Sequence, residues 1–199
     1  MKSVKTTSKR FVYVAFLSLS TSIFLATACE GNAAEDPKEI ADDRNDERFD
    51  DRKSEKDAEF LVEAAEINMK EIELGELAQQ KGTMQDVKDL GKMMVDEHSA
   101  ALDELQQLAD RKSIDLPASL TKDGQDAYDK LNEKSGKDFN KEYCDMMVKG
   151  HKKAIDLFEK YASDAEDSDI RNWASSMLPS LRVHLEHSVQ CEEKYKAMK

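Results

Sequence analysis

The chain has 199 residues, of which 39% are hydrophobic and 36% are charged, with only seven glycines and three prolines. This length fits one domain with appendages, and the scarcity of Gly and Pro disfavours a turn-rich sandwich or barrel and favours an all-helical fold. The formal net charge of −12 disfavours nucleic acid as a partner, because binding its phosphates requires a positive surface.

Residues 1–28 have the order of a secretory signal peptide. Basic residues up to Arg10 come first, an apolar stretch follows over residues 11–25, and small residues precede Cys29. The apolar stretch is too short and too interrupted to span a membrane stably. We therefore expect residues 1–28 to be removed on export.

Cys29 directly follows small residues, as in the lipobox of bacterial lipoproteins. In that interpretation Cys29 is lipidated and becomes the mature N-terminus. A lipobox usually has Leu at −3, whereas here Leu25 is at −4 and Ala26 at −3, so cleavage by an ordinary signal peptidase is the alternative. We expect a periplasmic protein or an outer-membrane lipoprotein that contacts the membrane through the lipid only.

Residues 29–53 are expected to form a disordered acidic tether. The stretch 30–57 holds twelve acidic and six basic residues and almost nothing apolar. Such a segment buries too little apolar surface to offset the entropy of ordering it.

The domain expected over residues 54–199 contains four long helices and one short helix. Capping residues, glycines and prolines predict helices over 54–80, 83–112, 121–134, 138–162 and 167–198. Ser54, Thr83, Thr121 and Asp138 are the expected caps of the first four, and Pro179 is expected to kink the last.

The long connection over residues 113–137 decides the expected topology. It is far longer than an antiparallel turn needs and can travel the length of a bundle. The second and third long helices are then parallel. We predict a ferritin-like four-helix bundle with a long crossover that carries the short helix.

Three histidines lie on the apolar faces of their helices. At 100° per residue, apolar residues bracket His98, His151 and His184, whereas His187 lies at an edge. Counted from the helix ends and turns, the three imidazoles fall at nearly the same height along the bundle. The sequence therefore predicts that they converge on one layer of the core.

Glu71 is the carboxylate that the first long helix turns toward the core. Burying a carboxylate costs several kcal/mol unless it is paired, hydrogen-bonded or bound to a cation. Counted with the rise per residue of an α-helix, the position of Glu71 along the bundle axis differs from that of His98 by about 8 Å. Glu66 lies closer to His98 along the bundle axis but points less toward the core. We therefore rank Glu71 first and Glu66 second as candidate ligands.

Three imidazoles and a carboxylate could hold a divalent first-row metal such as zinc, iron or copper. The alternative is three buried histidines that are hydrogen-bonded to their neighbours. Met94 and Met147 each precede a layer histidine by four residues. Thioethers beside imidazoles suit Cu(I), although methionine also serves as a flexible core filler.

No recognisable catalytic constellation accompanies the layer. A di-iron oxidase needs Glu-x-x-His on two helices, but Val95, Val148 and Leu181 stand three residues before the histidines. The sequence has no Gly-rich phosphate loop and no nucleophile signature. Ferroxidase chemistry is disfavoured, and a non-catalytic protein is favoured over an enzyme.

Cys144 and Cys191 are predicted to form a disulfide. Cys144 lies seven residues before His151, and Cys191 lies seven after His184. Antiparallel helices with level histidines therefore bring both cysteines to one height, where an oxidising compartment favours a bridge. Two free thiols or two thiolate metal ligands are the alternatives.

Several spaced motifs resemble the domain of unknown function 4142 family of exported bacterial proteins. They lie between about Asp57 and Gln190 and include Glu71–Ala78, Met94–His98, Met147–His151 and Leu178–His184. The resemblance implies a ferritin-like bundle outside the cytoplasmic membrane, and it marks as polar core positions Glu71, His98, His151 and His184. It also marks Asp96 and Glu97 where the family usually has two aspartates, so Glu97 is a secondary candidate.

Two functions are consistent with these features. The first is metal binding at the Glu/His layer, in metal handling or stress protection in the cell envelope. The second is a non-catalytic structural or interaction protein with structural buried histidines, whose surface or acidic tether engages an unknown envelope partner.

Overall fold

The computed structural model describes residues 35–197, and within this range the chain forms six α-helices and no strand. The helices are α1 (Pro37–Arg48), α2 (Arg52–Lys81), α3 (Gln85–Lys112), α4 (Lys122–Asn132), α5 (Gly136–Asp164) and α6 (Ser168–Ala197). The all-α prediction is confirmed. Residues 1–28, predicted to be a signal peptide, and Cys29 lie outside the described residues. Among residues 35–197, none of the helices is both long enough and apolar enough to span a membrane.

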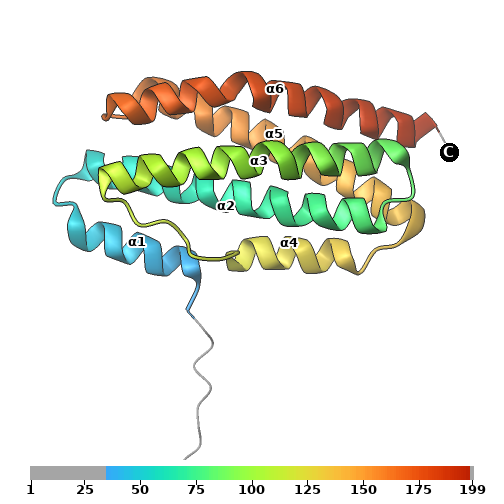
Figure 1. Ribbon diagram of the computed structural model, residues 1–199, viewed down its shortest axis with the longest axis horizontal. Coiled ribbons are helices and arrows are strands. Elements are labelled where there is room, and N and C mark those ends of the chain that lie inside the picture. The colour runs from blue at the N-terminus through green and yellow to red at the C-terminus, as the bar shows by residue number, and fades with distance from the viewer. Residues whose placement is uncertain (1–34, 198–199) are drawn as a thin grey trace, which may run out of the picture. The chain divides into compact units, whose positions relative to one another are not determined.

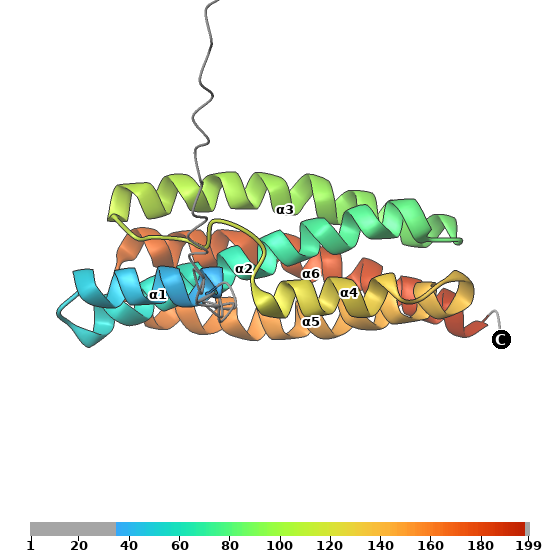
Figure 2. The same ribbon diagram turned by 90° about the horizontal axis from the view of Figure 1, so that it is seen from below.

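The four long helices lie side by side (Figures 1 and 2), with α2 and α3 forming one antiparallel hairpin and α5 and α6 another. The chain between the hairpins returns along α2 and carries α4, so that α3 and α5 run in the same direction (Figure 1). The connection between α3 and α5 is therefore a long crossover, as its length predicted. It places α4 against α2 and, to a lesser extent, against α5.

Local capping sets two of the helix starts as predicted. The Thr121 side chain accepts a hydrogen bond from the backbone N–H of Gly124. The Asp167 side chain accepts from the N–H groups of Asp169 and Ile170 at the start of α6. The helix α6 then continues through Pro179.

Ser54, Thr83 and Asp138 are not the caps that the sequence suggested. The cap of α2 is Asp51, whose side chain accepts hydrogen bonds from the N–H groups of Lys53 and Ser54. The helix α3 begins after Met84, and α5 begins after Ser135. The Thr83 hydroxyl instead accepts a hydrogen bond from Asn140 Nδ2 at 2.7 Å, and its N–H donates to Asn140 Oδ1 at 3.0 Å. A contact between two elements has therefore taken the place of a local cap.

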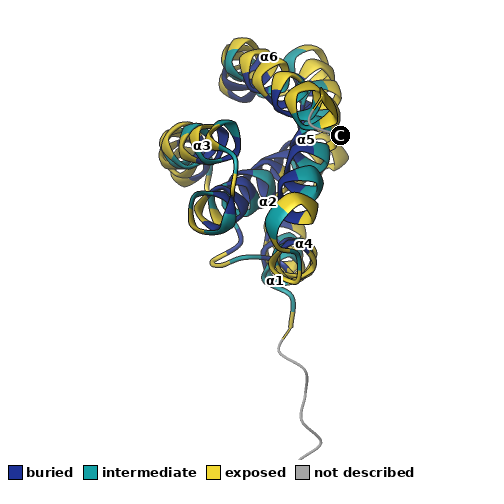
Figure 3. Ribbon diagram, turned by 90° about the vertical axis from the view of Figure 1, so that its right-hand side faces the viewer, coloured by how far each residue is buried: buried dark blue, intermediate teal, exposed yellow. Residues whose placement is uncertain are grey.

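A polar layer divides the core into two apolar clusters. One cluster surrounds Phe60, Phe158 and Trp173, and the other surrounds Phe139 and Tyr143. Buried polar residues of the four long helices lie between these clusters along the chain: Asn68, Glu71, His98, His151, His184 and Ser188. The end view in Figure 3 shows the buried faces of the long helices turned toward one another.

Two glycines allow α2 and α3 to approach closely. A Cβ on Gly75 would lie 2.7 Å from the Gly91 carbonyl oxygen, and a Cβ on Gly91 would lie 2.7 Å from that of Gly75. A side chain at either position would push the two helices apart. This close hairpin places Asn68 of α2 beside His98 of α3.

The expectation of a disordered tether over residues 29–53 is corrected for residues 37–48, which form α1. Asn45 is buried; its side chain donates to the Asp115 carbonyl at 2.9 Å and accepts from the Asp115 N–H at 2.8 Å. Lys38 also forms an ion pair with Glu66 of α2 at 3.0 Å. The segment buries little apolar surface, and polar contacts to distant residues hold this helix in place.

The predicted disulfide is present. Cys144 of α5 and Cys191 of α6 are joined, with their Cα atoms 5.9 Å apart. Both cysteines are buried in the cluster around Phe139 and Tyr143. They are therefore neither free thiols nor thiolate ligands.

Candidate metal centre

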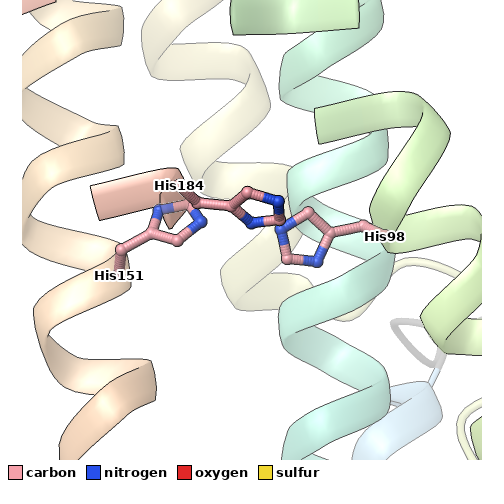
Figure 4. A group of neighbouring side chains, drawn as sticks. All are labelled: His98, His151 and His184. Carbon is pink, nitrogen blue, oxygen red and sulfur yellow. The ribbon is translucent and has the colours of Figure 1, made fainter. Parts of the chain in front are cut away.

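Three helices bring one imidazole each to a common point in the polar layer. His98 comes from α3, His151 from α5 and His184 from α6, and all three are buried. Their ring centroids lie 5.1 to 5.7 Å apart, and one nitrogen of each ring lies within 4.8 Å of the others. Figure 4 shows the three rings turned toward one another. The predicted convergence of the histidines is confirmed.

The tautomer of His98 follows from its neighbour on α2. Asn68 Nδ2 donates to the Ala64 carbonyl at 2.8 Å, which leaves Asn68 Oδ1 to face His98 Nδ1 at 2.9 Å. Because an amide oxygen can only accept, His98 Nδ1 carries the hydrogen. The lone pair of the neutral ring is then on Nε2.

The other two rings are oriented in the same way. His151 Nδ1 donates to the Met147 carbonyl at 2.9 Å, and His184 Nε2 donates to the Glu97 carboxylate at 2.8 Å. The lone pairs of these rings are therefore on His151 Nε2 and His184 Nδ1. Metal-bound histidines usually donate their outer N–H to a carbonyl or a carboxylate in this manner.

The three inner nitrogens have no hydrogen-bond partner. His98 Nε2, His151 Nε2 and His184 Nδ1 are buried and unbonded in the structure. Each is the lone-pair nitrogen that the outer hydrogen bond leaves available. The cluster therefore presents three nitrogen donors that could hold one metal ion.

Burial favours the neutral forms of His98 and His184. Desolvation lowers the pKa of His98 well below its ordinary value of 6.5, and the nearby imidazoles lower it further. Desolvation also lowers the pKa of His184, although Glu97 opposes this shift. At neutral pH the inner lone pairs of these two rings are thus available to a metal instead of being occupied by a proton.

Glu71 does not join the group of converging nitrogens. It is buried near Gly150, at which a Cβ would lie 3.0 Å from Glu71 Oε1, and its Oε2 has no partner. Desolvation raises its pKa, and His151 partly opposes this effect. Glu71 also contributes to raising the pKa of Tyr143, which burial raises well above 10.0. The carboxylate therefore lies in the field of His151 but outside the donor set.

The secondary candidates lie in different places. Glu66 is occupied by its ion pair with Lys38, and Glu97 bonds His184 from a side chain that is 48% exposed. Met94 and Met147 are fully buried in the second apolar cluster. Met147 contributes its backbone carbonyl to His151.

Asn68, the partner of His98, was not among the site residues predicted from the sequence. Asn68 lies on the same face of its helix as Glu71 and three residues nearer the histidine layer. Its position along the helix could therefore have identified it as the partner of His98. The residues predicted on this helix, Glu71 and Glu66, are both carboxylates. An amide accepts a hydrogen bond from a neutral imidazole without adding a buried charge.

The arrangement suits an ion with nitrogen ligands. Zinc–nitrogen distances of about 2.0–2.1 Å in a tetrahedral site place nitrogen atoms about 3.4 Å apart. The inner nitrogens spread over as much as 4.8 Å, so the rings would close slightly around an ion. Three ligands fill three positions and leave the fourth to another group.

Comparison with known families matches residues 44–190 to a family described as Domain of unknown function (DUF4142). The resemblance inferred for about residues 57–190 is confirmed, and the matched region begins earlier, within α1. No curated protein and no solved structure matches the chain.

Proposed function

Because the chain belongs to the DUF4142 family, whose description names no activity, we propose a function from the site: His98, His151 and His184 bind one first-row transition metal ion. The observation that carries this proposal is the set of three buried inner nitrogens, each with its lone pair and none with a partner.

The alternative is that the histidines serve only to stabilise the core. In that case three lone pairs face one another without a donor, and an unsatisfied buried polar group costs about 1–3 kcal/mol. A proton would satisfy only part of the set, and burial lowers the pKa of His98 and of His184. One metal ion satisfies all three nitrogens together.

Zinc and copper suit this donor set best. Imidazole binds zinc, copper, iron and nickel, and affinity for a given nitrogen site rises from iron to copper. Three histidines with a fourth open position form a well-known zinc arrangement. Iron stays a weaker candidate, because the Glu-x-x-His pairs of a di-iron centre are missing.

The site belongs, in our proposal, to a ferritin-like bundle that works in the cell envelope in metal handling or stress protection. The signal-peptide pattern of residues 1–28 and Cys29 support export and lipidation. The Cys144–Cys191 disulfide supports an oxidising compartment. The parallel α3 and α5 with their long crossover support the ferritin-like connection.

Elemental analysis tests the proposal. The full-length chain is exported, then purified without chelator or polyhistidine tag, beside a His98→Ala, His151→Ala double variant. The matched control is His187→Ala, because His187 lies on the same helix as His184 but outside the cluster. Circular dichroism checks that each variant is folded.

We expect close to one metal ion per chain in the wild-type protein and the control, and none in the double variant. Metal that persists in the folded double variant would overturn the assignment of the site. A wild-type protein that stays empty after challenge with zinc, copper and iron would leave a structural or interaction protein as the function.

A further inference from the structure

We propose that the groove between α2, α4 and α5 binds a small zwitterion of the amino-acid type, whose ammonium group bonds the buried carboxylate of Glu71. The groove lies where α4 contacts α2 and, to a lesser extent, α5, and its volume is about 610 Å³. That size is typical of sites for small molecules. His98, His151 and His184 do not line the groove, so this site is separate from the candidate metal centre and does not need the metal.

Glu71 is the residue that points to a ligand. Its side chain lines the groove, although the residue is only 2% exposed. Among the described residues, no donor reaches Glu71 Oε2. A buried carboxylate is costly unless hydrogen-bond donors or a positive charge satisfy it. An ammonium group supplies both, because it is positively charged and carries three N–H donors.

Gly150 leaves the groove open above this carboxylate. It lines the groove together with Glu71, and a Cβ at position 150 would lie 3.0 Å from Glu71 Oε1. A larger side chain at this position of α5 would therefore cover the carboxylate. Because glycine stands there instead, a ligand in the groove can approach Glu71 from the side of α5.

The walls of the groove carry opposite charges. Glu142 pairs with Lys130 at 2.6 Å, and Asp145 pairs with Lys141. The lining residues that form no ion pair within residues 35–197 are acidic on α4 and basic on α2 and α5, namely Asp123 and Asp126 on one side and Lys70, Lys149 and Lys153 on the other. A ligand with one positive and one negative group complements these walls better than a simple amine or acid does.

Apolar side chains lie beside the carboxylate in the lining. Leu74 and Met147 are buried, and Ala127 and Met146 are partly buried. An apolar side chain on the ligand would remove further apolar surface from water by packing against them. The groove therefore suits an amino acid with an apolar side chain, such as leucine or methionine.

Titration followed by nuclear magnetic resonance tests the proposal. The full-length chain is exported, purified with an isotope label, and titrated with L-leucine, L-methionine or L-phenylalanine, with the backbone amide of Gly150 as the signal. Each titration uses the protein as purified and after treatment with EDTA, because amino acids also chelate metal ions. We expect saturable shifts with at least one of the three amino acids and the same affinity in both preparations.

Two analogues of leucine test its two charges separately. Isoamylamine lacks the carboxylate and should bind more weakly than leucine, because it no longer interacts with the lysines. Isocaproate lacks the ammonium group and should not bind measurably, because its only charge repels Glu71. Isocaproate that binds as tightly as leucine would overturn the proposed contact with Glu71.

Glu71→Gln removes the charge of the buried side chain and keeps its size. This variant should bind leucine at least about tenfold more weakly, as expected for losing a hydrogen bond between charged groups. Glu73→Gln is the matched control, because Glu73 is exposed on the same helix and does not line the groove. Gly150→Leu fills the space above the carboxylate and should abolish binding. The spectrum of each variant also shows whether it is folded.

Three further outcomes would overturn the inference. The first is that none of the three amino acids shifts the Gly150 signal. The second is equal affinity for leucine in the wild-type and Glu71→Gln proteins. The third is binding that disappears after EDTA treatment, which would place the amino acid on the metal ion. None of these outcomes affects the proposed metal site, whose test is the metal content.

Discussion

The two nitrogens of each clustered imidazole have opposite surroundings. The outer nitrogen donates to an oxygen, and the inner nitrogen faces the other two rings with its lone pair free. The oxygens come from three kinds of group, namely a side-chain amide, a backbone carbonyl and a carboxylate. Orientation by outer partners lowers the cost of assembling a metal site, because the rings need little rearrangement.

The low pKa of His98 predicts that the metal-free protein loses stability in mild acid. Below the ordinary histidine pKa of 6.5, the unfolded chain takes up a proton that the folded ring does not. The stabilisation is therefore complete above about pH 6.5 and falls by up to about 1.4 kcal/mol per pH unit below it. Urea unfolding at pH 7.5 and 5.5 measures this loss.

A His98→Gln variant provides the comparison for that experiment. It lacks the titrating ring and should lose less stability between the two pH values than the wild-type protein. The raised pKa of Glu71 acts in the opposite direction, because the folded state takes up this proton first as the pH falls. An equal loss in both proteins would contradict the role given to His98.

Asn68 is predicted to strengthen metal binding without touching the ion. In Asn68→Leu, His98 Nδ1 loses its acceptor, so the ring is no longer held with Nε2 inward. Loss of such an outer partner typically lowers metal affinity about 10–100-fold. Competition with a chromogenic zinc chelator measures the change.

Asn68→Asp is the matched variant for this test. It keeps an oxygen acceptor in nearly the same place and should retain most of the affinity. Equal affinities in the Leu and Asp variants would show that the hydrogen bond to His98 does not orient the ring.

At the scale of the elements, α1 and the chain after α3 hold each other in place. Asn45 bonds both backbone groups of Asp115, and Arg48 forms an ion pair with the Asp115 side chain at 2.6 Å. Asp36 accepts hydrogen bonds from the N–H groups of Lys38 and Lys122. The α1 helix therefore supports the crossover that leads to α4.

Removing the Asn45 amide is predicted to weaken this support. Asn45→Ala leaves the Asp115 N–H and carbonyl without their partners and should destabilise the domain by about 1–3 kcal/mol. Asp46→Ala is the control, because Asp46 is exposed on the same helix. Urea unfolding compares the two variants, and similar midpoints would mean that α1 contributes little to the fold.

At the scale of the whole domain, the α5–α6 hairpin contributes both to the polar layer and to the disulfide, at separate places along its length. The helices α5 and α6 supply His151 and His184 to the layer and Cys144 and Cys191 to the cluster beside it. The hairpin also packs extensively along its length. The metal site should therefore survive loss of the disulfide, although the domain becomes less stable.

A Cys144→Ala, Cys191→Ala double variant tests this separation. A disulfide with a sequence separation of 47 residues stabilises by about 4 kcal/mol in the loop-entropy account. That corresponds to a fall of roughly 10 °C in Tm for a domain of this size. Thermal unfolding followed by elemental analysis should show a lower Tm with unchanged metal content, whereas loss of metal would tie the bridge to the site.

Most of the correct predictions follow from the periodicity and spacing of residues along the chain. The apolar periodicity of the long helices set which face each histidine would turn inward, and the constant helical rise set its height. The length of the 113–137 stretch predicted the crossover, and equal offsets from the histidines predicted the Cys144–Cys191 bridge. All of these depend on spacing along the chain, which an α-helix converts directly into position.

Only the tertiary structure decided the features that depend on partners distant in sequence. Thr83 bonds Asn140 instead of capping α3, and Asn45 orders a segment with the composition of a tether. Asn68 rather than Glu71 meets His98, because the packing of α2 against α3 decides which residue on this face lies level with the imidazole. Spacing thus determined which helices carry the site, and packing between helices determined which atoms meet there.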